Sequence, residues 1–291
     1  MKTIYYLLLI LIYSSCQKEL SIPLPEHQQK LTCNSLFTKD SIFLYLTQSQ
    51  LIYDKLNHTN ISDASILFKS GNELLTHIDF SSEGYYKSGI KLSENTNYTL
   101  EITTNGYNLV FSNDYLPELV KIDSLIFFPK VGMDEEGDEY SEVIIYFTDP
   151  IYIKNYYEIS VYYLFSDPYS GRLAYRQGGI NSNDLVVMNE GDDDFFYSNI
   201  VLSDDFFNGE KYQLKCNISY NENHPVYYLH LRSISENYYK YKKSLMRHFA
   251  NQEGDVWSGS GNPVELYSNI EGGYGIFAGY QEDVDTIYAN K

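Results

Sequence analysis

The sequence predicts a mainly β protein of two domains. An immunoglobulin-like β-sandwich over residues 30–116 is followed, over residues 117–291, by a second β-sandwich or barrel-like domain that carries one helix. Apolar and polar residues alternate in short runs. Tyr98, Leu100 and Ile102, for example, alternate with polar neighbours, which is the period of a strand with one buried face. The length of 291 residues exceeds that of most single domains, so two are expected.

The N-terminal domain is predicted from short β-prone runs separated by turn signals. Asn105-Gly106 is one such signal and predicts a tight hairpin between the last two strands. Many short strands with frequent turns favour an immunoglobulin-like sandwich. The expected strands are residues 31–37, 42–47, 64–69, 73–80, 98–103 and 107–111, with another that starts at residue 84.

Pro117 marks the expected domain boundary, and the second domain is again predicted from β-prone runs. Asp149-Pro150 ends one of its strands, because proline has no N–H for the ladder. Residues 133–140 are expected to form an acidic loop. The expected strands are residues 120–128, 143–147, 156–165, 172–176, 185–188, 212–219 and 226–234.

One helix is predicted, over residues 235–252. Its aromatic and aliphatic residues recur at helical spacing on one side, and lysines occupy the other faces. The sequence leaves two alternatives for the residue that caps the start of this helix. Ser233 with Glu236 fits a capping box, and Ser235 is an alternative N-cap.

The N-terminus predicts the compartment. Residues 4–13 are apolar but too short to span a bilayer comfortably, and Ser14-Ser15-Cys16 follows them. This arrangement resembles a bacterial lipoprotein signal, with a signal peptide over residues 1–15, lipid on Cys16 and a polar tether over residues 16–29. There are two alternatives: an ordinary signal peptide with an incidental cysteine, and an anchor that is not cleaved.

The formal net charge of −18 argues against nucleic acid and anionic lipid surfaces as partners. Cys33 and Cys216 lie in different predicted domains, and a disulfide between them stays open. After residue 13 no apolar run is long enough to cross a membrane.

Few residues have the spacing of a metal or catalytic site. Asp192, Asp193 and Asp194 are weak calcium candidates, but they do not match an EF-hand loop, and a solvated hairpin tip is the alternative. Histidines lack zinc spacing, and Ser260 lacks the glycine of a nucleophile elbow. We therefore expect no cofactor and no enzymatic activity.

Residues 262–279 form a glycine-rich stretch that follows the helix and a loop with the sole tryptophan, Trp257. The glycines predict positive φ angles or close backbone approach. One interpretation is a structural clasp that closes the second domain against the helix. The other is a loop that faces a ligand or partner, with Trp257, Tyr267 and Tyr274 as stacking candidates.

The same stretch, together with the Tyr-Tyr pattern at the helix start, resembles a Bacteroidota lipoprotein family known as domain of unknown function 4249. The quoted residues are Ser235-Glu236-Asn237-Tyr238-Tyr239, Asn262-Pro263-Val264, Tyr267-Ser268-Asn269-Ile270 and Gly273-Tyr274-Gly275-Ile276-Phe277-Ala278-Gly279. Phe147-Thr148-Asp149-Pro150 and the cysteine at position 16 also fit. The resemblance covers nearly the whole chain that would follow the signal peptide.

The resemblance implies a non-catalytic lipoprotein anchored in the outer membrane and facing outward, with the periplasmic face as the alternative. Members are often encoded beside TonB-dependent transporters of the starch-utilisation type. An accessory or ligand-binding partner of such a transporter, with a glycan or peptide ligand, is therefore expected. A free-standing glycan-binding or adhesive surface module is the alternative function.

Overall fold

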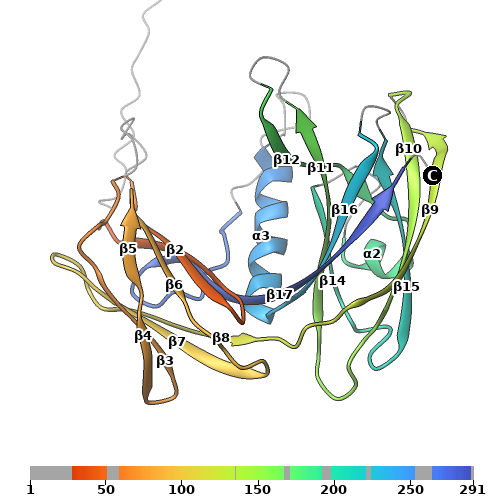
Figure 1. The fold of residues 1–291 in the computed structure, drawn as a ribbon. Coiled ribbons are helices and arrows are strands. Elements are labelled where there is room, and N and C mark those ends of the chain that lie inside the picture. The colour runs from red at the N-terminus through yellow and green to blue at the C-terminus, as the bar shows by residue number, and fades with distance from the viewer. Residues whose placement is uncertain are drawn as a thin grey trace, which may run out of the picture.

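The computed structural model describes residues 28–50, 59–134, 136–166, 171–191, 198–220, 224–252 and 264–289. Within these ranges the chain is mainly β, as predicted, with several sheets and no closed barrel (Figure 1). The strands gather in an N-terminal and a C-terminal part. Within the same ranges, no helix is long and apolar enough to cross a membrane.

The N-terminal part is a sandwich of two sheets. Its strands are β1 (Leu31–Phe37), β2 (Ser41–Gln48), β3 (Ser65–Ser70), β4 (Glu73–His77), β5 (Asp79–Ser82), β6 (Tyr85–Gly89), β7 (Thr96–Thr103) and β8 (Val110–Leu116). One sheet has the order β4-β3-β7-β8, and the other contains β1-β2-β6-β5. Alternate residues of both sheets, such as Leu44 and Leu100, fill one buried core.

The C-terminal part contains the remaining elements. They are β9 (Ile122–Met133), β10 (Glu139–Thr148), β11 (Tyr156–Ser166), β12 (Leu173–Gln177), β13 (Ile180–Asn181), α2 (Leu185–Asn189), β14 (Asn199–Ser203), β15 (Lys211–Ser219), β16 (Val226–Ile234), α3 (Glu236–Gln252) and β17 (Tyr274–Tyr288). The sheet β13-β15-β10-β9 encloses a second apolar core together with β14, β11 and β16.

The last strand, β17, belongs to both parts. Residues 274–279 pair in parallel with β1, and residues 280–288 pair antiparallel with β16. The result is one long sheet, β12-β11-β16-β17-β1-β2-β6-β5, with β14 beside β11, that runs through the molecule (Figure 1). Phe277 lies in the N-terminal core, where its ring stacks on Phe37 with centroids 4.7 Å apart. The boundary expected at Pro117 stays a prediction.

Helix α3 lies on the face of this sheet away from the two cores. Val201, Ile234, Tyr238, Ile276 and Ala278 form a third buried cluster beneath it. The predicted helix is therefore present.

Ser235 is the N-cap of α3, because its hydroxyl oxygen accepts the N–H of Tyr238 at 3.2 Å. The capping-box alternative is wrong, because the Ser233 hydroxyl oxygen accepts the N–H of Val120 instead, at 3.0 Å.

The strand expected at residues 185–188 is wrong, since these residues form α2. Asp184 caps this helix by accepting the N–H of Val186 at 2.9 Å, so a local side-chain bond outweighs the β propensity of Val186 and Val187. β14 and β17 were not expected. The first half of β17 is buried on both faces, and its second half is acidic, so it lacks a clean two-residue period.

The two cysteines are both free and buried, Cys33 in the N-terminal core and Cys216 in the C-terminal core. The disulfide that the sequence left open is therefore not formed.

Candidate functional site

A polar groove of about 340 Å³ lies where the two parts meet at the start of α3. Strands β7 and β8 supply one wall, and residues 153–156 supply the other. The lining residues are Asn97, Asn113, Asp114, Tyr115, Pro117, Ile153, Lys154, Asn155, Tyr156, Ile234, Ser235, Glu236 and Asn237. We call this feature the junction groove.

Asp114 is the buried carboxylate of the junction groove, with 4% of its surface exposed. It accepts the Ser235 hydroxyl and, at 2.8 Å each, the N–H of Gly279 and the amide of Asn237. Burial raises the pKa of Asp114 to about 6, although these hydrogen bonds favour the ionised form. One carboxylate thus connects β8, the start of α3 and β17.

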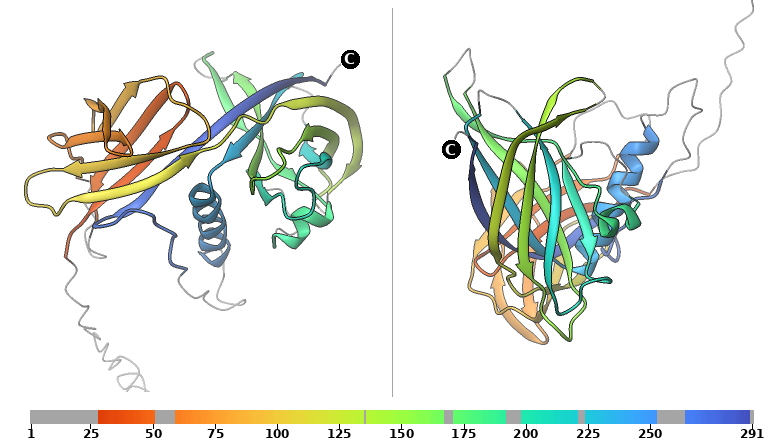
Figure 2. Two further views of the ribbon diagram at one scale, coloured as in Figure 1. Left: turned by 90° about the horizontal axis from the view of Figure 1, so that it is seen from below. Right: turned by 90° about the vertical axis from the view of Figure 1, so that its right-hand side faces the viewer.

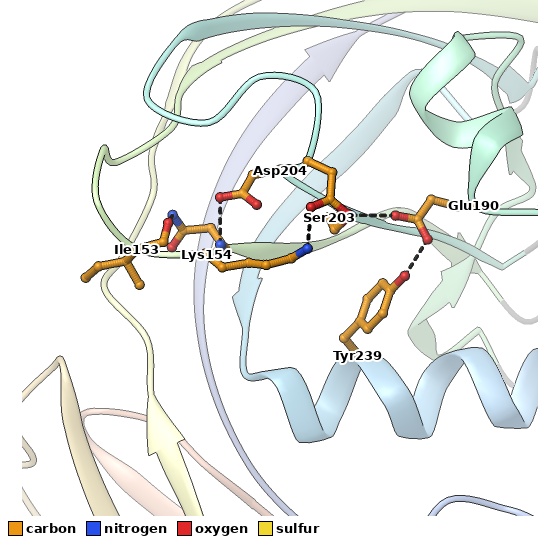
Figure 3. A network of polar contacts seen from close by, with 8 residues as sticks. Ile153, Lys154, Glu190, Ser203, Asp204 and Tyr239 are labelled. Atoms are coloured by element: carbon orange, nitrogen blue, oxygen red, sulfur yellow. Dashed lines mark hydrogen bonds and ion pairs between the residues drawn. The ribbon is translucent and has the colours of Figure 1, made fainter.

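The other wall of the groove is held by a short polar network (Figure 3). The N–H of Asn155 donates to Asp204 at 2.8 Å, and the Asn155 amide donates to the carbonyl of Ile153, also at 2.8 Å. Lys154 forms an ion pair with Asp205. The loop that carries Lys154 is therefore fixed to the turn after β14.

The network continues to α3 through Glu190, which follows α2 (Figure 3). Glu190 accepts the N–H of Ser203 at 2.9 Å and the hydroxyl of Tyr239. Lys243 donates to the carbonyl of Glu190 at 3.1 Å. These bonds place α2, β14 and α3 in a defined arrangement beside the groove.

A second charged cluster lies beneath α3. Glu158, 1% exposed, contacts Arg232 at 3.1 Å and Lys242 at 2.7 Å. Burial alone would raise the pKa of Glu158, but the charges of Lys242 and Arg232 hold it below its ordinary value. Glu282 lies 2.6 Å from the guanidinium of Arg232 and 2.9 Å from the imidazole of His230, so it is a second carboxylate of this cluster.

The structure separates the sequence-predicted aromatic candidates. Tyr267 lies next to the junction groove, since its hydroxyl donates to Asn237 and its N–H donates to Ser244 at 2.9 Å. Tyr274 starts β17 away from the groove, with the ammonium of Lys30 5.0 Å from its ring centroid. Trp257 lies outside the described residues, so a stacking surface made of all three stays a prediction.

Cys16 and the calcium candidates Asp192, Asp193 and Asp194 also lie outside the described residues. In the parts of the chain that the structure does describe, no three His, Cys, Asp or Glu side chains gather as a metal site.

The glycine-rich stretch makes close contacts, as a clasp would, but its glycines meet β1 and β8 of the N-terminal part and not the helix. Gly275 has a φ of 112°, and a Cβ there would lie 2.0 Å from the carbonyl oxygen of Cys33. A Cβ on Gly279 would lie 2.4 Å from the carbonyl oxygen of Tyr115. The side chain of Asn269 bonds both the N–H and the carbonyl of Phe277, at 2.9 and 2.7 Å. The predicted close backbone approach is confirmed.

Sequence reasoning missed Asp114 as a site residue. The available signal was its place on the buried face of β8, where Val110, Ser112, Asp114 and Leu116 all point into the protein. A carboxylate at a core-facing position of a strand needs a partner. Its partners lie at the start of α3 and on β17, more than a hundred residues away along the chain, and no local sequence pattern predicts them.

The fold and the junction groove define a class: two β parts that share one C-terminal strand and meet around a polar groove. The chain belongs to the family described as "Domain of unknown function (DUF4249)", whose model matches residues 17–286. No curated protein matches the sequence.

Among solved structures, a chain of a "Cytokine receptor complex" is 9% identical, with 90% of this chain and 97% of that chain covered and a TM-score of 0.26. A putative membrane anchored protein from Corynebacterium diphtheriae is 12% identical over 72% of this chain and 55% of that one, with a TM-score of 0.22. An alpha-L-rhamnosidase from Dictyoglumus thermophilum is 11% identical over 89% and 29%, with a TM-score of 0.25. At these TM-scores the likenesses carry no argument about function.

Proposed function

We propose that this chain is a non-catalytic lipoprotein of the outer membrane, held by lipid on Cys16 and facing outward. It serves as an accessory or ligand-binding partner of a TonB-dependent transporter of the starch-utilisation type. Membership of the family, whose model matches residues 17–286, supports the proposal, because the resemblance to that family implies such a transporter as a partner.

The junction groove is the observation that carries the binding role. Its lining combines four asparagines with tyrosine, lysine and carboxylate side chains, which supply paired donors and acceptors. Asp114 already accepts hydrogen bonds from three donors, so its role is to hold the groove residues in place and not to contact a ligand. The groove suits a polar ligand such as a glycan or a peptide segment.

Recovery of a transporter from outer membranes through the full, natively acylated chain tests the role. Asn113→Arg places a long side chain in the groove from an exposed position of β8, and we expect it to reduce recovery of the transporter. Asn105→Arg, at the exposed turn before β8, is the matched control and should leave recovery unchanged. Failure of the wild-type chain to recover any transporter would refute the role.

The anchor is tested separately. We expect labelled fatty acid to enter the wild-type chain and not the Cys16→Ala variant, and we expect that variant to leave the membrane fraction. Proteolysis of intact cells then distinguishes the outward from the periplasmic face. An unlabelled wild-type chain would overturn the anchor but not the groove.

The amide-rich lining of the groove also favours the second candidate, a free-standing glycan-binding module. In that case retardation of the purified chain in polysaccharide gels should be lost with Asn113→Arg and kept with Asn105→Arg. This binding would need no transporter.

A further inference from the structure

Two long strands of the C-terminal part each have one edge without a strand partner. β9 is the last strand of its sheet, and residues 280–288 of β17 pair only with β16. Among the described residues, no strand occupies the other edge of either. The two edges meet at one point, where the N–H of Ile122 donates to Asp283 at 2.9 Å. We call residues 122–133 and 280–288 the seam.

Both strands of the seam run in the same sense, from the N-terminal part towards the end where the chain terminates (Figures 1 and 2). They start as neighbours and diverge towards that end in Figure 2, right. Their inner neighbours, β10 and β16, run antiparallel to them. A strand that entered between β9 and β17, antiparallel to both, would continue the alternation of directions across the gap.

The outer face of the seam carries several exposed apolar side chains. On β9, Leu125 and Phe127 pack against the core, so Ile126 and Phe128 point outward, and both are exposed. On β17, Val284 and Tyr288 are exposed as well. Residues 122–128 form the regular part of this edge, which Pro129 and an irregularity at Lys130 then interrupt. A regular edge with exposed apolar side chains is the kind of surface that pairs with another chain unless it is covered.

The inner face of the seam carries two carboxylates, both on β17. Asp283 lies opposite Leu231 and Asp285 lies opposite Leu229, and both leucines are core residues, so the two aspartates are on the core side of β17. Asp285 is nevertheless exposed, which fits an inner face that is open at the seam. Basic side chains on an entering strand would complement these carboxylates.

We propose that the seam binds an extended segment of a partner protein, which adds as an antiparallel strand between β9 and β17. Apolar residues of that segment lie beside Phe128 and Val284 on the outer face, and alternating Lys or Arg residues lie towards Asp285 on the inner face. Main-chain hydrogen bonds supply affinity, and the alternate side chains supply selectivity. A second copy of this chain is disfavoured, because it carries a net charge of −18 and would bring another acidic edge to the seam.

The inference is independent of the junction groove and of the transporter, and random peptides test it directly. The full chain is used to select binding peptides from a displayed library of random peptides, each about nine residues long, which is the length of a long strand. We expect enriched sequences in which apolar residues alternate with Lys or Arg. A synthetic peptide of the winning sequence should slow amide hydrogen exchange at residues 122–133 and 280–288.

Variants make the outcome specific to the seam. Phe128→Glu should weaken binding of the peptide at least about tenfold. Phe43→Glu on β2 is the matched control and should leave binding unchanged, since the two phenylalanines are similarly exposed, at 42% and 48%. Asp285→Lys should shift the selected peptides from basic to acidic residues. Thermal unfolding of each variant checks that the fold is kept.

Several results would overturn the proposal. They are enriched peptides without alternation, exchange protection elsewhere on the chain, or equal binding by the Phe128→Glu variant. A dimer of the free chain that protects β9 would assign the seam to a second copy. Competition by a peptide of residues 17–27 would assign it to the chain's own N-terminal segment.

Discussion

Asp114 shows how a single buried residue can make the junction between the two parts sensitive to pH. Its ordinary pKa is 3.8, and burial raises the pKa in the folded chain to about 6. The folded state therefore holds the proton more tightly than the unfolded state does. The stability that this group contributes is complete below pH 3.8 and is lost as the pH rises through about 6.

When the pH falls from 7 to 5, we expect the free energy of unfolding of the wild-type chain to rise by about 1 kcal/mol because of this group. The Asp114→Asn variant should not show this rise. The variant is also less stable at both pH values, because an amide nitrogen replaces one acceptor. Urea unfolding at the two pH values measures the difference, and Asp79→Asn, at an exposed carboxylate, is the control. The same pH slope in the Asp114→Asn variant and the wild type would contradict the assignment.

Glu158 is the residue on which the charge cluster under α3 depends. Glu158→Gln leaves the half-buried Lys242 without its carboxylate and Arg232 with Glu282 alone, and we expect a loss of about 3 kcal/mol, the lower end for a broken buried pair. Glu236→Gln is the control on α3. It removes only an exposed ion pair with Lys240 and should cost less than about 1 kcal/mol. Chemical denaturation measures both, and equal losses would rule out a central role for Glu158.

At the scale of elements, β17 explains why the glycine-rich stretch has its composition. The strand must pass close to β1 and then turn to pair with β16, and the backbone of β8 also crosses it near Gly279. Close approach of backbones leaves no room for a Cβ. The glycines at these positions are therefore required by packing between elements, whichever ligand the protein binds.

Gly275→Ala should be strongly destabilising, by about 3 kcal/mol or more, because the added Cβ meets the carbonyl of Cys33 at a φ that alanine avoids. Gly89→Ala is the matched change at the end of β6. It has no atom within 4 Å of the added Cβ and no positive φ, so it should be neutral or slightly stabilising. Thermal unfolding of the two variants separates these effects, and a stable Gly275→Ala variant would argue against the clasp.

At the scale of the whole molecule, β17 makes the two parts depend on each other. Phe277 completes the N-terminal core, and Ile287 belongs to the C-terminal core. The Gly279 N–H also holds Asp114 at the junction groove. Neither part has its full set of strands without the end of the chain.

A chain that ends at residue 273 should therefore fail to fold either part, while a chain that ends at residue 289 should unfold as the full chain does. For the full chain we expect one cooperative calorimetric transition that includes both parts. Two separate transitions, or a folded N-terminal part in the shortened chain, would show that the parts are independent.

The sequence by itself determined the mainly β class, most strands and the position of α3, because a strand with one buried face and an amphipathic helix leave periodic patterns. It also indicated the family, and it indicated the close backbone contacts through glycine. These features depend on neighbouring residues along the chain, so a local pattern is enough to predict them.

Only the tertiary structure decided that β17 is shared, that Asp114 is buried at the junction groove and that the seam is open. Each of these depends on contacts between residues far apart in the chain, as between Asp114 and Ser235 or between Ile122 and Asp283. Burial and pairing at such positions are set by which strands meet, and residue spacing carries no record of that. This is why the elements were largely predictable and the candidate site was not.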